Sequence, residues 1–424
     1  MIIALIMFGL TYVLLLSFPK YRAYIAMGSG IIFILTGYIS IKDALGAIDW
    51  NVLMMIAGTM GIVALFIESK MPSLLADVII SHTPNVKWAI VALSLFASII
   101  SAFVDNVATV LMVAPVAITI AKKLNISPVK SIIAIAISSN LQGAATLVGD
   151  TTSIMLGGQL NMTFFDFFIY EGKLGLFFVV QVGCLAATLV LLYLFRKEKQ
   201  PLEKMEKTIV TDYVPSILLL GTIVLLVIAS FFGDYLPKEI NGFICMGLLV
   251  LGLIYAVIRN KTFKVVPKVL KEIDYFTILL LTGLFIVIGG IEGAGIIKKI
   301  GDLIREVSGG NVFVVYTIIV WASVLLSAFI DNIPYIATML PVIAAVSTNP
   351  DFANYDTLLY FGLLIGATLG GNLTPIGASA NITGLGILRK EGHEVKASTF
   401  MKISVPFTLV AVTVGYILVW LIWS

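Results

Sequence analysis

Two carboxylates in this chain stand inside long apolar stretches, where a charged side chain needs a function or a partner. Asp105-Asn106 interrupts the stretch 86–121, and Asp331-Asn332 interrupts 311–347. A carboxylate at membrane depth costs several kcal/mol unless it lines a cavity inside the protein. It can then bind a cation or carry a proton, and it can also cap a helix that begins at the next residue. The sequence leaves both roles open.

Two further segments combine glycines with polar side chains in apolar surroundings, namely Gly143 to Ser153 and Gly370 to Asn381. Pro375 removes a helix donor and frees a carbonyl. Unwound carbonyls and hydroxyls can bind a cation, while the N–H groups of a following half-helix favour an anion or a polar neutral solute. A glycine-mediated packing seam is the alternative, although such a seam does not require carboxyl and amide groups.

The composition places the chain in a membrane. Apolar residues make up 59% of its 424 positions and charged residues 12%, against about 45–50% and 25% in soluble domains. A soluble fold cannot bury that much hydrocarbon, so lipid must cover much of the surface. The net charge of +3 is small and the basic residues are dispersed, which argues against a nucleic-acid partner.

The sequence lacks the motifs of common enzyme classes. Cys184 and Cys245 lie in apolar runs, and His82 and His393 stand far apart in polar connectors. Walker, Ser-His-Asp and HExxH motifs do not occur. We therefore expect neither an enzyme nor a bound cofactor, and no metal beyond a sodium ion at the carboxylate segments.

The elements that must position these segments are apolar runs of crossing length, about 20 residues each. Each acid-bearing stretch is too long for one crossing, and two short helices that meet at the acid-amide pair, a re-entrant hairpin, keep the break inside protein. The first run lacks a basic n-region and a cleavage site, so we expect it to be retained. The predicted all-α crossings are 1–18, 22–41, 50–68, 128–149, 173–195, 214–232, 240–258, 274–292, 358–376 and 401–423.

Loop charges support this topology. It leaves on one side only six of the 27 basic residues, and it puts the rest on the other side. The positive-inside rule makes the basic side cytoplasmic. Both termini then lie outside the plasma membrane, and the linker 196–213 is cytoplasmic. The six residues of the outer side are Lys42, Lys173, Lys238, Lys298, Lys299 and Arg305.

The chain repeats itself at a spacing of about 226 residues. Residues 101–106 (SAFVDN) match 327–332 (SAFIDN), and 143–149 match 371–377. Five crossings in each half, an odd number, invert the second half relative to the first, as in many secondary transporters. The predicted units are a first repeat 1–195 (hairpin 86–121, broken helix 128–160), the linker 196–213, and a second repeat 214–424 (hairpin 311–347, broken helix 358–388).

In these segments the chain resembles the ion-transporter superfamily, in particular its branch of arsenite permeases, NhaD-type sodium/proton antiporters and the melanosomal P protein. That branch is related to the divalent-anion/sodium symporters, whose citrate and succinate members carry Ser-Asn-Thr at the hairpin tips, so we expect this chain to lie outside the citrate and succinate branch. Residues 101–109 and 327–334 match the tips, and 366–381 matches the second broken helix. One departure is Gly149-Asp-Thr-Thr-Ser153, where relatives typically continue Gly-Asp-Pro-Pro-Asn.

The resemblance implies a scaffold part and a mobile transport part in a homodimer that works by an elevator motion. For an arsenite-type carrier it also implies an ATPase subunit as partner. The candidate contacts for cargo or coupling ion, from the resemblance and the broken segments together, are Asp105, Asn106, Thr109, Thr146, Gly149, Asp150, Thr151, Asp331, Asn332, Thr338, Asn372, Thr374, Gly377, Ser379 and Asn381.

We expect a proton-coupled secondary transporter of a small inorganic ion or solute, with an arsenite-like solute as the first candidate. Deep acids without a deep Lys or Arg give protons or cations obvious ligands, whereas a multiply charged carboxylate would have only helix ends. A sodium/proton antiporter, a sodium-coupled dicarboxylate or anion symporter, and an anion channel are the alternatives.

The topology yields a prediction. Because most basic residues fall on one side, Lys204→Cys should react with an impermeant thiol reagent added to the cytoplasmic side only. Labelling of intact cells from outside would contradict the whole arrangement of crossings.

Overall fold

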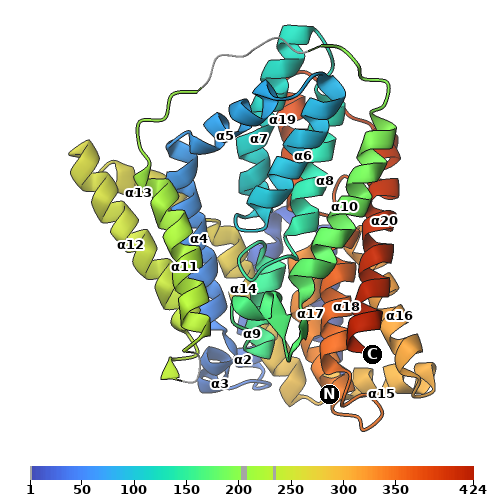
Figure 1. The fold of residues 1–424 in the computed structure, drawn as a ribbon. Helices are drawn as coiled ribbons and strands as arrows, with labels where there is room; N and C mark the ends of the chain where they lie inside the picture. Colours follow the sequence, from blue (N-terminus) through green and yellow to red (C-terminus); the bar gives the residue numbers. More distant parts are fainter. Residues whose placement is uncertain (1, 202–207, 233–234) are drawn as a thin grey trace.

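The computed structural model describes residues 2–201, 208–232 and 235–424. The part of the predicted linker that contains Lys204 lies outside the described residues. In the described part the chain is helical apart from one small hairpin, in which Ile169 pairs with Leu174 and Tyr170 with Lys173. Figure 1 shows both termini at one end of the molecule, opposite the end at which the described parts of the linker lie.

The described residues of the first half form ten α-helices, two short 3-10 helices and two short strands. In chain order they are α1 (Ile2–Ser17), η1 (Pro19–Tyr21), α2 (Arg22–Leu35), α3 (Ile41–Ala47), α4 (Trp50–Glu68), α5 (Met71–Ser81), α6 (Val86–Ser101), α7 (Asn106–Leu124), α8 (Val129–Gln142), α9 (Thr151–Leu160), η2 (Phe165–Phe167), β1 (Ile169–Tyr170), β2 (Lys173–Leu174) and α10 (Leu176–Leu194).

The described residues of the second half form ten α-helices in a similar order of lengths. They are α11 (Val214–Ser230), α12 (Ile240–Asn260), α13 (Val265–Lys271), α14 (Tyr275–Gly293), α15 (Ile296–Ser308), α16 (Val312–Ser327), α17 (Asn332–Ser347), α18 (Asp356–Gly370), the 3-10 helix η4 (Gly371–Leu373), α19 (Ser379–Lys390) and α20 (Ala397–Trp423).

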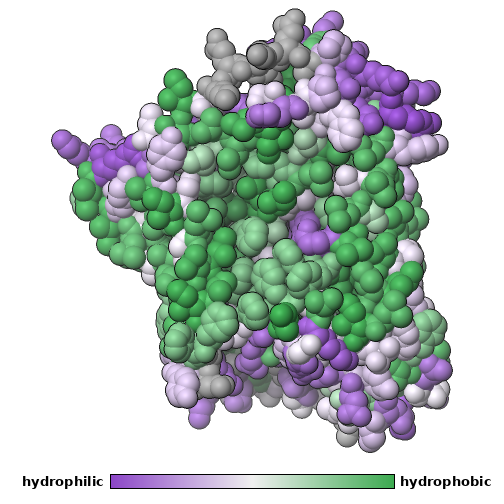
Figure 2. Space-filling view, in the orientation of Figure 1, coloured by the Kyte–Doolittle hydropathy of each residue, from purple (hydrophilic) through white to green (hydrophobic). Residues whose placement is uncertain are grey.

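Six helices in the described residues are long and apolar enough to cross a membrane by themselves: α4, α7, α10, α12, α14 and α20. The other predicted crossings correspond to α1, α2, α8, α11 and α18, which have 14 to 17 residues. The stretch 86–121 divides into α6 and a 19-residue α7, so its second half is longer than the short helix predicted for a hairpin. Figure 2 shows a broad hydrophobic band between two hydrophilic ends, as a membrane protein requires.

The two acid-bearing helix pairs lie in different halves of the molecule. Figure 1 shows α6 and α7 in the upper half with α19, and α16 and α17 in the lower half with α9. The non-helical residues 102–105 separate α6 from α7, and the non-helical residues 328–331 separate α16 from α17. The ends of both breaks therefore face the middle of the molecule.

Two long helix pairs join the halves of the chain. α2 packs along α14, and α4 packs along α12. Small residues allow these close approaches: a Cβ on Gly283 would lie 2.4 Å from the backbone of Ala26 and Met27, and one on Gly58 would lie 2.5 Å from the backbone of Cys245. The halves are therefore interlocked.

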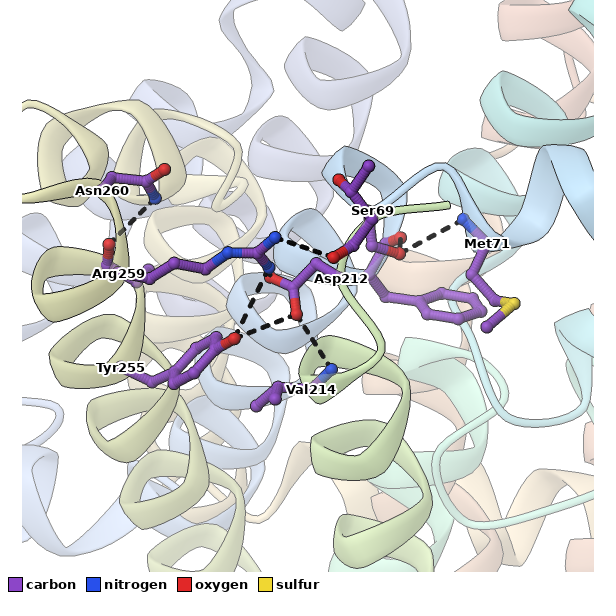
Figure 3. A network of polar contacts seen from close by, with 10 residues as sticks. Ser69, Met71, Asp212, Val214, Tyr255, Arg259 and Asn260 are labelled. Carbon is purple, nitrogen blue, oxygen red and sulfur yellow. Dashed lines mark hydrogen bonds and ion pairs between the residues drawn. The ribbon is translucent and has the colours of Figure 1, made fainter. Parts of the chain in front are cut away.

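The linker residues Thr211 and Asp212 contact α12 through hydrogen bonds and an ion pair. Arg259 forms an ion pair with Asp212, and Tyr255 donates to the same carboxylate at 3.1 Å (Figure 3). Arg259 also donates to the Thr211 carbonyl at 2.9 Å. At the other described end, Glu198 pairs with Lys130 of α8. The linker thus contacts both α8 and α12.

The glycine contacts generate a prediction for stability. Gly283→Ala should destabilise the protein by about 1–3 kcal/mol, because the added methyl group meets backbone that cannot move aside. Thermal unfolding in detergent measures this, with Gly28→Ala on α2 as the control, since a Cβ there meets nothing within 4 Å. Equal unfolding temperatures for both variants would show that α2 and α14 are not packed as described.

Candidate functional site

The starts of four helices meet at one cavity in the middle of the protein. α7, α9, α17 and α19 each contribute their first residue, and α4, α8 and the start of α14 complete the wall. The volume of this site cavity is about 150 Å³, enough for several water molecules or one small solute, since about 10–15 Å³ already holds one water. Its polar lining residues are Asp105, Asn106, Asn140, Asp150, Thr151, Glu272, Asp274, Thr277, Asp331, Asn332 and Ser379.

Carboxylates cap three of the four helices. Asp105 Oδ1 accepts from the N–H groups of Val107 at 3.0 Å and Ala108 at 3.1 Å. Asp150 accepts from the Thr151 N–H at 2.8 Å and from the Thr152 hydroxyl at 3.0 Å. The capping role that the sequence left open is therefore present. Both carboxylates also line the site cavity, so capping leaves them available to a ligand.

Asp331 differs from the other two because it has a basic partner. Its Oδ1 accepts from the Ile333 N–H at 3.2 Å, while Oδ2 lies 2.9 Å from Arg22 Nη1 and 3.2 Å from the Ser379 hydroxyl. From the sequence, Arg22 is expected to be a loop charge, and no deep Arg or Lys is expected. That expectation is wrong, because the Arg22 side chain is only 18% exposed and reaches the second hairpin tip.

Two matching threonines hold the broken helices against the tips. Thr146 donates to the carbonyl of Ala102, and Thr374 donates to the carbonyl of Ala328. The glycines that follow them, Gly149 and Gly377, fit against the same tips: a Cβ on Gly377 would lie 2.8 Å from the carbonyl oxygens of both Ser327 and Ala328, and Gly149 faces the equivalent carbonyls. These four residues therefore shape the site from behind and do not line the cavity.

In each broken helix, a side chain after the break donates a hydrogen bond to a backbone carbonyl at the start of the break. Ser153 donates to the Gly143 carbonyl at 2.7 Å, and Asn381 donates to the Gly371 carbonyl at 3.1 Å. The two side chains occupy corresponding places, so Ser153 supplies in the first half the contact that an amide supplies in the second.

Amides connect the two halves beneath the cavity. Asn106 donates to the Asn140 side chain at 3.0 Å, and Asn140 donates to the Thr368 carbonyl at 2.8 Å. In the orientation that satisfies its amide, Asn332 donates to the carbonyls of Ala367 and Gly377. Asn372 crosses in the opposite direction, donating to the Ile137 carbonyl at 2.8 Å. The four helix starts are thus held as one unit.

The structure brings seven of the predicted site residues to the cavity and leaves the others behind it. Those at the cavity are Asp105, Asn106, Asp150, Thr151, Asp331, Asn332 and Ser379. Thr109 donates toward the Val104 carbonyl, and Thr338 donates to Pro334 in its own helix, so both serve α7 and α17 internally. Thr146, Gly149, Asn372, Thr374, Gly377 and Asn381 support the broken helices.

Five residues at the site were not predicted. Asn140 lies within the regular helix α8, where no break marked it. Glu272, Asp274 and Thr277 lie at the start of α14, and Asp274 caps that helix through Thr277. Residues 272–275 (EIDY) resemble residues 47–50 (AIDW) of the first half, and this similarity is the signal in the sequence that marks them. Arg22 is the fifth.

A second cavity, the opposite cavity, lies at the other end of the same helices. Its volume is about 510 Å³, and it is lined by Asp49, Gln159, Glu292 and apolar residues of α14 and α17. α9 and α17 run between the two cavities: their first residues line the site cavity and their later residues line the opposite one. The carboxylates Asp105, Asp150 and Asp331 face the site cavity only.

The sequence profile of the citrate transporter family matches residues 12–361. The chain belongs to the citrate transporter family. It is therefore a multi-pass membrane transporter and not an enzyme, and the resemblance to the ion-transporter superfamily is confirmed.

Curated relatives agree with this assignment. An uncharacterized transporter of Mycobacterium tuberculosis is 28% identical over 435 residues, which cover 99% of this chain and 98% of the relative. The 46 kDa membrane protein of Mycobacterium leprae is 28% identical and is covered to 98%. The human P protein is 27% identical over 454 residues, covering 88% of this chain and 54% of the P protein.

Two solved transporters share the fold. The YdaH transporter of Alcanivorax borkumensis has a TM-score of 0.59 at 13% identity, with 89% of this chain and 86% of that one covered. MtrF of Neisseria gonorrhoeae, from a class of antimetabolite efflux pumps, has a TM-score of 0.56 at 16% identity, with 92% and 83% covered. At these identities the likeness concerns the fold alone.

The supporting role of the threonines can be tested. Thr146→Val or Thr374→Val should each destabilise the protein by about 1–3 kcal/mol, since a buried hydroxyl loses its bond to a hairpin-tip carbonyl. Thermal unfolding in detergent reports the change, and Thr338→Val is the control because that partly buried hydroxyl bonds back to the Pro334 carbonyl of its own helix. A similar loss of stability in all three variants would show that Thr146 and Thr374 do not support the broken helices more than Thr338 supports α17.

Proposed function

We propose that this protein is a proton-coupled secondary transporter of a small inorganic solute that is neutral or cationic, an arsenite-like hydroxide being the first candidate. The observation that carries the proposal is the charge of the site cavity. Five carboxylates, from Asp105, Asp150, Glu272, Asp274 and Asp331, line it, and none of the described residues in its lining is Lys, Arg or His.

The charges at the four helix starts nearly cancel. Each helix N-terminus carries about half a positive charge, so α7, α9, α17 and α19 together supply about two. Arg22 adds one more and offsets, with them, the three carboxylates Asp105, Asp150 and Asp331. An uncharged hydroxylated solute can bind at these four starts, because it can use donors and acceptors without adding charge to the cavity.

The same charges disfavour a multiply charged carboxylate as free cargo. Glu272 and Asp274 add further negative charge at the start of α14, and like charges in a low-dielectric cavity repel strongly. The family is named for citrate, so a citrate-type anion would have to enter this cavity with its charge neutralised. A sodium/proton antiporter is the second candidate, because Asp105 and Asp150 offer oxygen ligands and have no basic partner among the described residues.

We further propose that the two halves are inverted repeats with re-entrant hairpins and that transport uses an elevator motion. The matched contacts of Thr146 with Ala102 and of Thr374 with Ala328 support the repeat. The two cavities support the motion. α9 and α17 lie between them, and the carboxylates at the starts of these helices line the site cavity and not the opposite cavity. Exposing the site to the opposite cavity requires that unit to move against α4 and α14. In the proposed orientation the linker side is cytoplasmic.

The proposed coupling role predicts a separation of folding from transport. Asp105→Asn should fold and insert normally, since Asn caps a helix about as well as Asp, yet it should lose pH-dependent transport because the titratable group is gone. The measurement is the current in proteoliposomes on a solid-supported membrane, with arsenite, sodium, chloride and dicarboxylates offered at several pH values. Asp43→Asn, in the exposed first turn of α3 and outside both cavities, is the control.

The outcomes separate the candidate functions. Arsenite currents that depend on pH in the wild type and not in Asp105→Asn support the first proposal, and sodium currents that do so support the antiporter. Unchanged rates and pH dependence in Asp105→Asn, Asp150→Asn and Asp331→Asn would leave these carboxylates with capping alone.

A further inference from the structure

We propose that Arg22 is a built-in counter-cation for the second hairpin tip, which occupies Asp331 in this conformation and leaves the binding of the coupling cation or proton to Asp105 and Asp150. This inference rests on the proposed function, because it assigns the coupling step of that transporter to one of its two halves. It makes Arg22 a positioning and specificity residue that acts through Asp331.

The contacts of Asp331 involve both oxygens of its carboxylate. Arg22 Nη1 lies 2.9 Å from Oδ2, and the side chains are 18% and 8% exposed. The Ser379 hydroxyl and the Ile333 N–H take further positions on the same carboxylate. The guanidinium of Arg22 also lies 5.9 Å from the centre of the Phe276 ring, while its buried Nε has no hydrogen-bond partner among the described residues.

The first hairpin tip has the same acid without the cation. Asp105 caps α7 as Asp331 caps α17, but the described residues place no Lys or Arg within ion-pair distance of Asp105. Asp150 also lacks a basic partner there and lines the same cavity. The two tips are therefore alike in backbone and unlike in charge.

The packing of the long helices identifies the position in the second half that corresponds to Arg22. Gly283 of α14 contacts Ala26 of α2, and Gly58 of α4 contacts Cys245 of α12 in the same way. One helical turn before these contacts stand Arg22 and Asn241 respectively. The position that corresponds to Arg22 thus holds a neutral amide.

This asymmetry has a defined physical consequence. A guanidinium stays charged at any pH that a protein experiences, so it balances the charge of the Asp331 carboxylate and excludes a second cation from it. The other charged groups that face the same cavity, Glu272, Asp274, Asp105 and Asp150, are all acidic, and Tyr12 of α1 contributes only a hydrogen bond to the Pro334 carbonyl. Without Arg22, Asp331 would be a buried and unpaired carboxylate that must take up a proton or a metal cation.

The first experiment measures cation binding without any cargo. Full-length Arg22→Gln is unfolded thermally in detergent at pH 8 and pH 5, in choline chloride and in sodium chloride. In choline chloride at pH 8, the variant should unfold at a temperature a few degrees below that of the wild type. Sodium chloride or pH 5 should raise the unfolding temperature of the variant by more than it raises that of the wild type. Arg22→Gln/Asp331→Asn, which removes both charges, should lose this added dependence. Lys268→Gln, in the exposed pair with Glu68, should behave as the wild type.

Specific results would overturn the proposal. It fails if Arg22→Gln shows no added response to sodium or protons, or if the double variant retains that response. Arg22→Lys keeps the charge and should resemble the wild type, so the same added response in that variant also counts against the proposal. If Arg22→Gln does not fold at pH 8, recovery of folding in the double variant supports the proposal, and failure of both variants contradicts it.

The second experiment measures the charge moved per cycle. In proteoliposomes with arsenite or ²²Na⁺ as the probe, Arg22→Gln should move one more positive charge per cycle than the wild type. Its accumulation ratio should then change by an additional factor of about ten for each 59 mV of membrane potential. An unchanged charge per cycle contradicts the proposal. If the wild type moves neither probe, the proposed function fails, and the unfolding experiment still decides the role of Arg22.

Discussion

A break in a membrane helix leaves backbone N–H and C=O groups that lipid cannot satisfy, and the centre of this protein contains four such breaks. Each free group must find a partner within the protein. Asp105, Asp150 and Asp331 accept from the N–H groups at the starts of three helices. Thr146 and Thr374 donate to the free carbonyls of the hairpin tips. The arrangement of the whole central unit follows from this requirement.

Satisfying backbone donors with carboxylates creates a second requirement, because three acidic side chains then lie close together in the middle of the protein. The structure meets it with helix N-termini and with one guanidinium, placed on α2 and directed at Asp331. A hydroxyl or an amide would also have capped these helices. The choice of carboxylates therefore provides titratable groups at the one place where a solute can reach them, which is what a coupled transporter needs.

The sequence revealed those features of the site that break a pattern. An acid within a long apolar stretch, or a run of glycines and hydroxyls within a crossing helix, is conspicuous, and so Asp105, Asp150 and Asp331 could be identified. Asn140 could not, because an amide inside a regular helix such as α8 breaks no pattern, although it bonds to Asn106 and Thr368. Arg22 lies beside Lys20 at a turn and was counted as a loop charge, since sequence distance does not show that the start of α2 faces the second hairpin. The roles of Thr374 and Asn381 were also beyond prediction, because only coordinates distinguish a side chain that faces a cavity from one that supports its wall.

The interlocking of the two halves has a consequence for the synthesis of the protein. α4 ends at Glu68, while its partner α12 begins at Ile240. The stretch of chain between α2 and its partner α14 is longer still. At about 5–20 residues per second, translation of the intervening chain takes about ten seconds to half a minute. During that time the grooves around Gly58 and Gly61 face lipid or the insertion machinery, with no partner helix in them. The amino-terminal half therefore enters the membrane as an unfinished intermediate, and a cell that makes this transporter must shield it until ribosomes have delivered the second half.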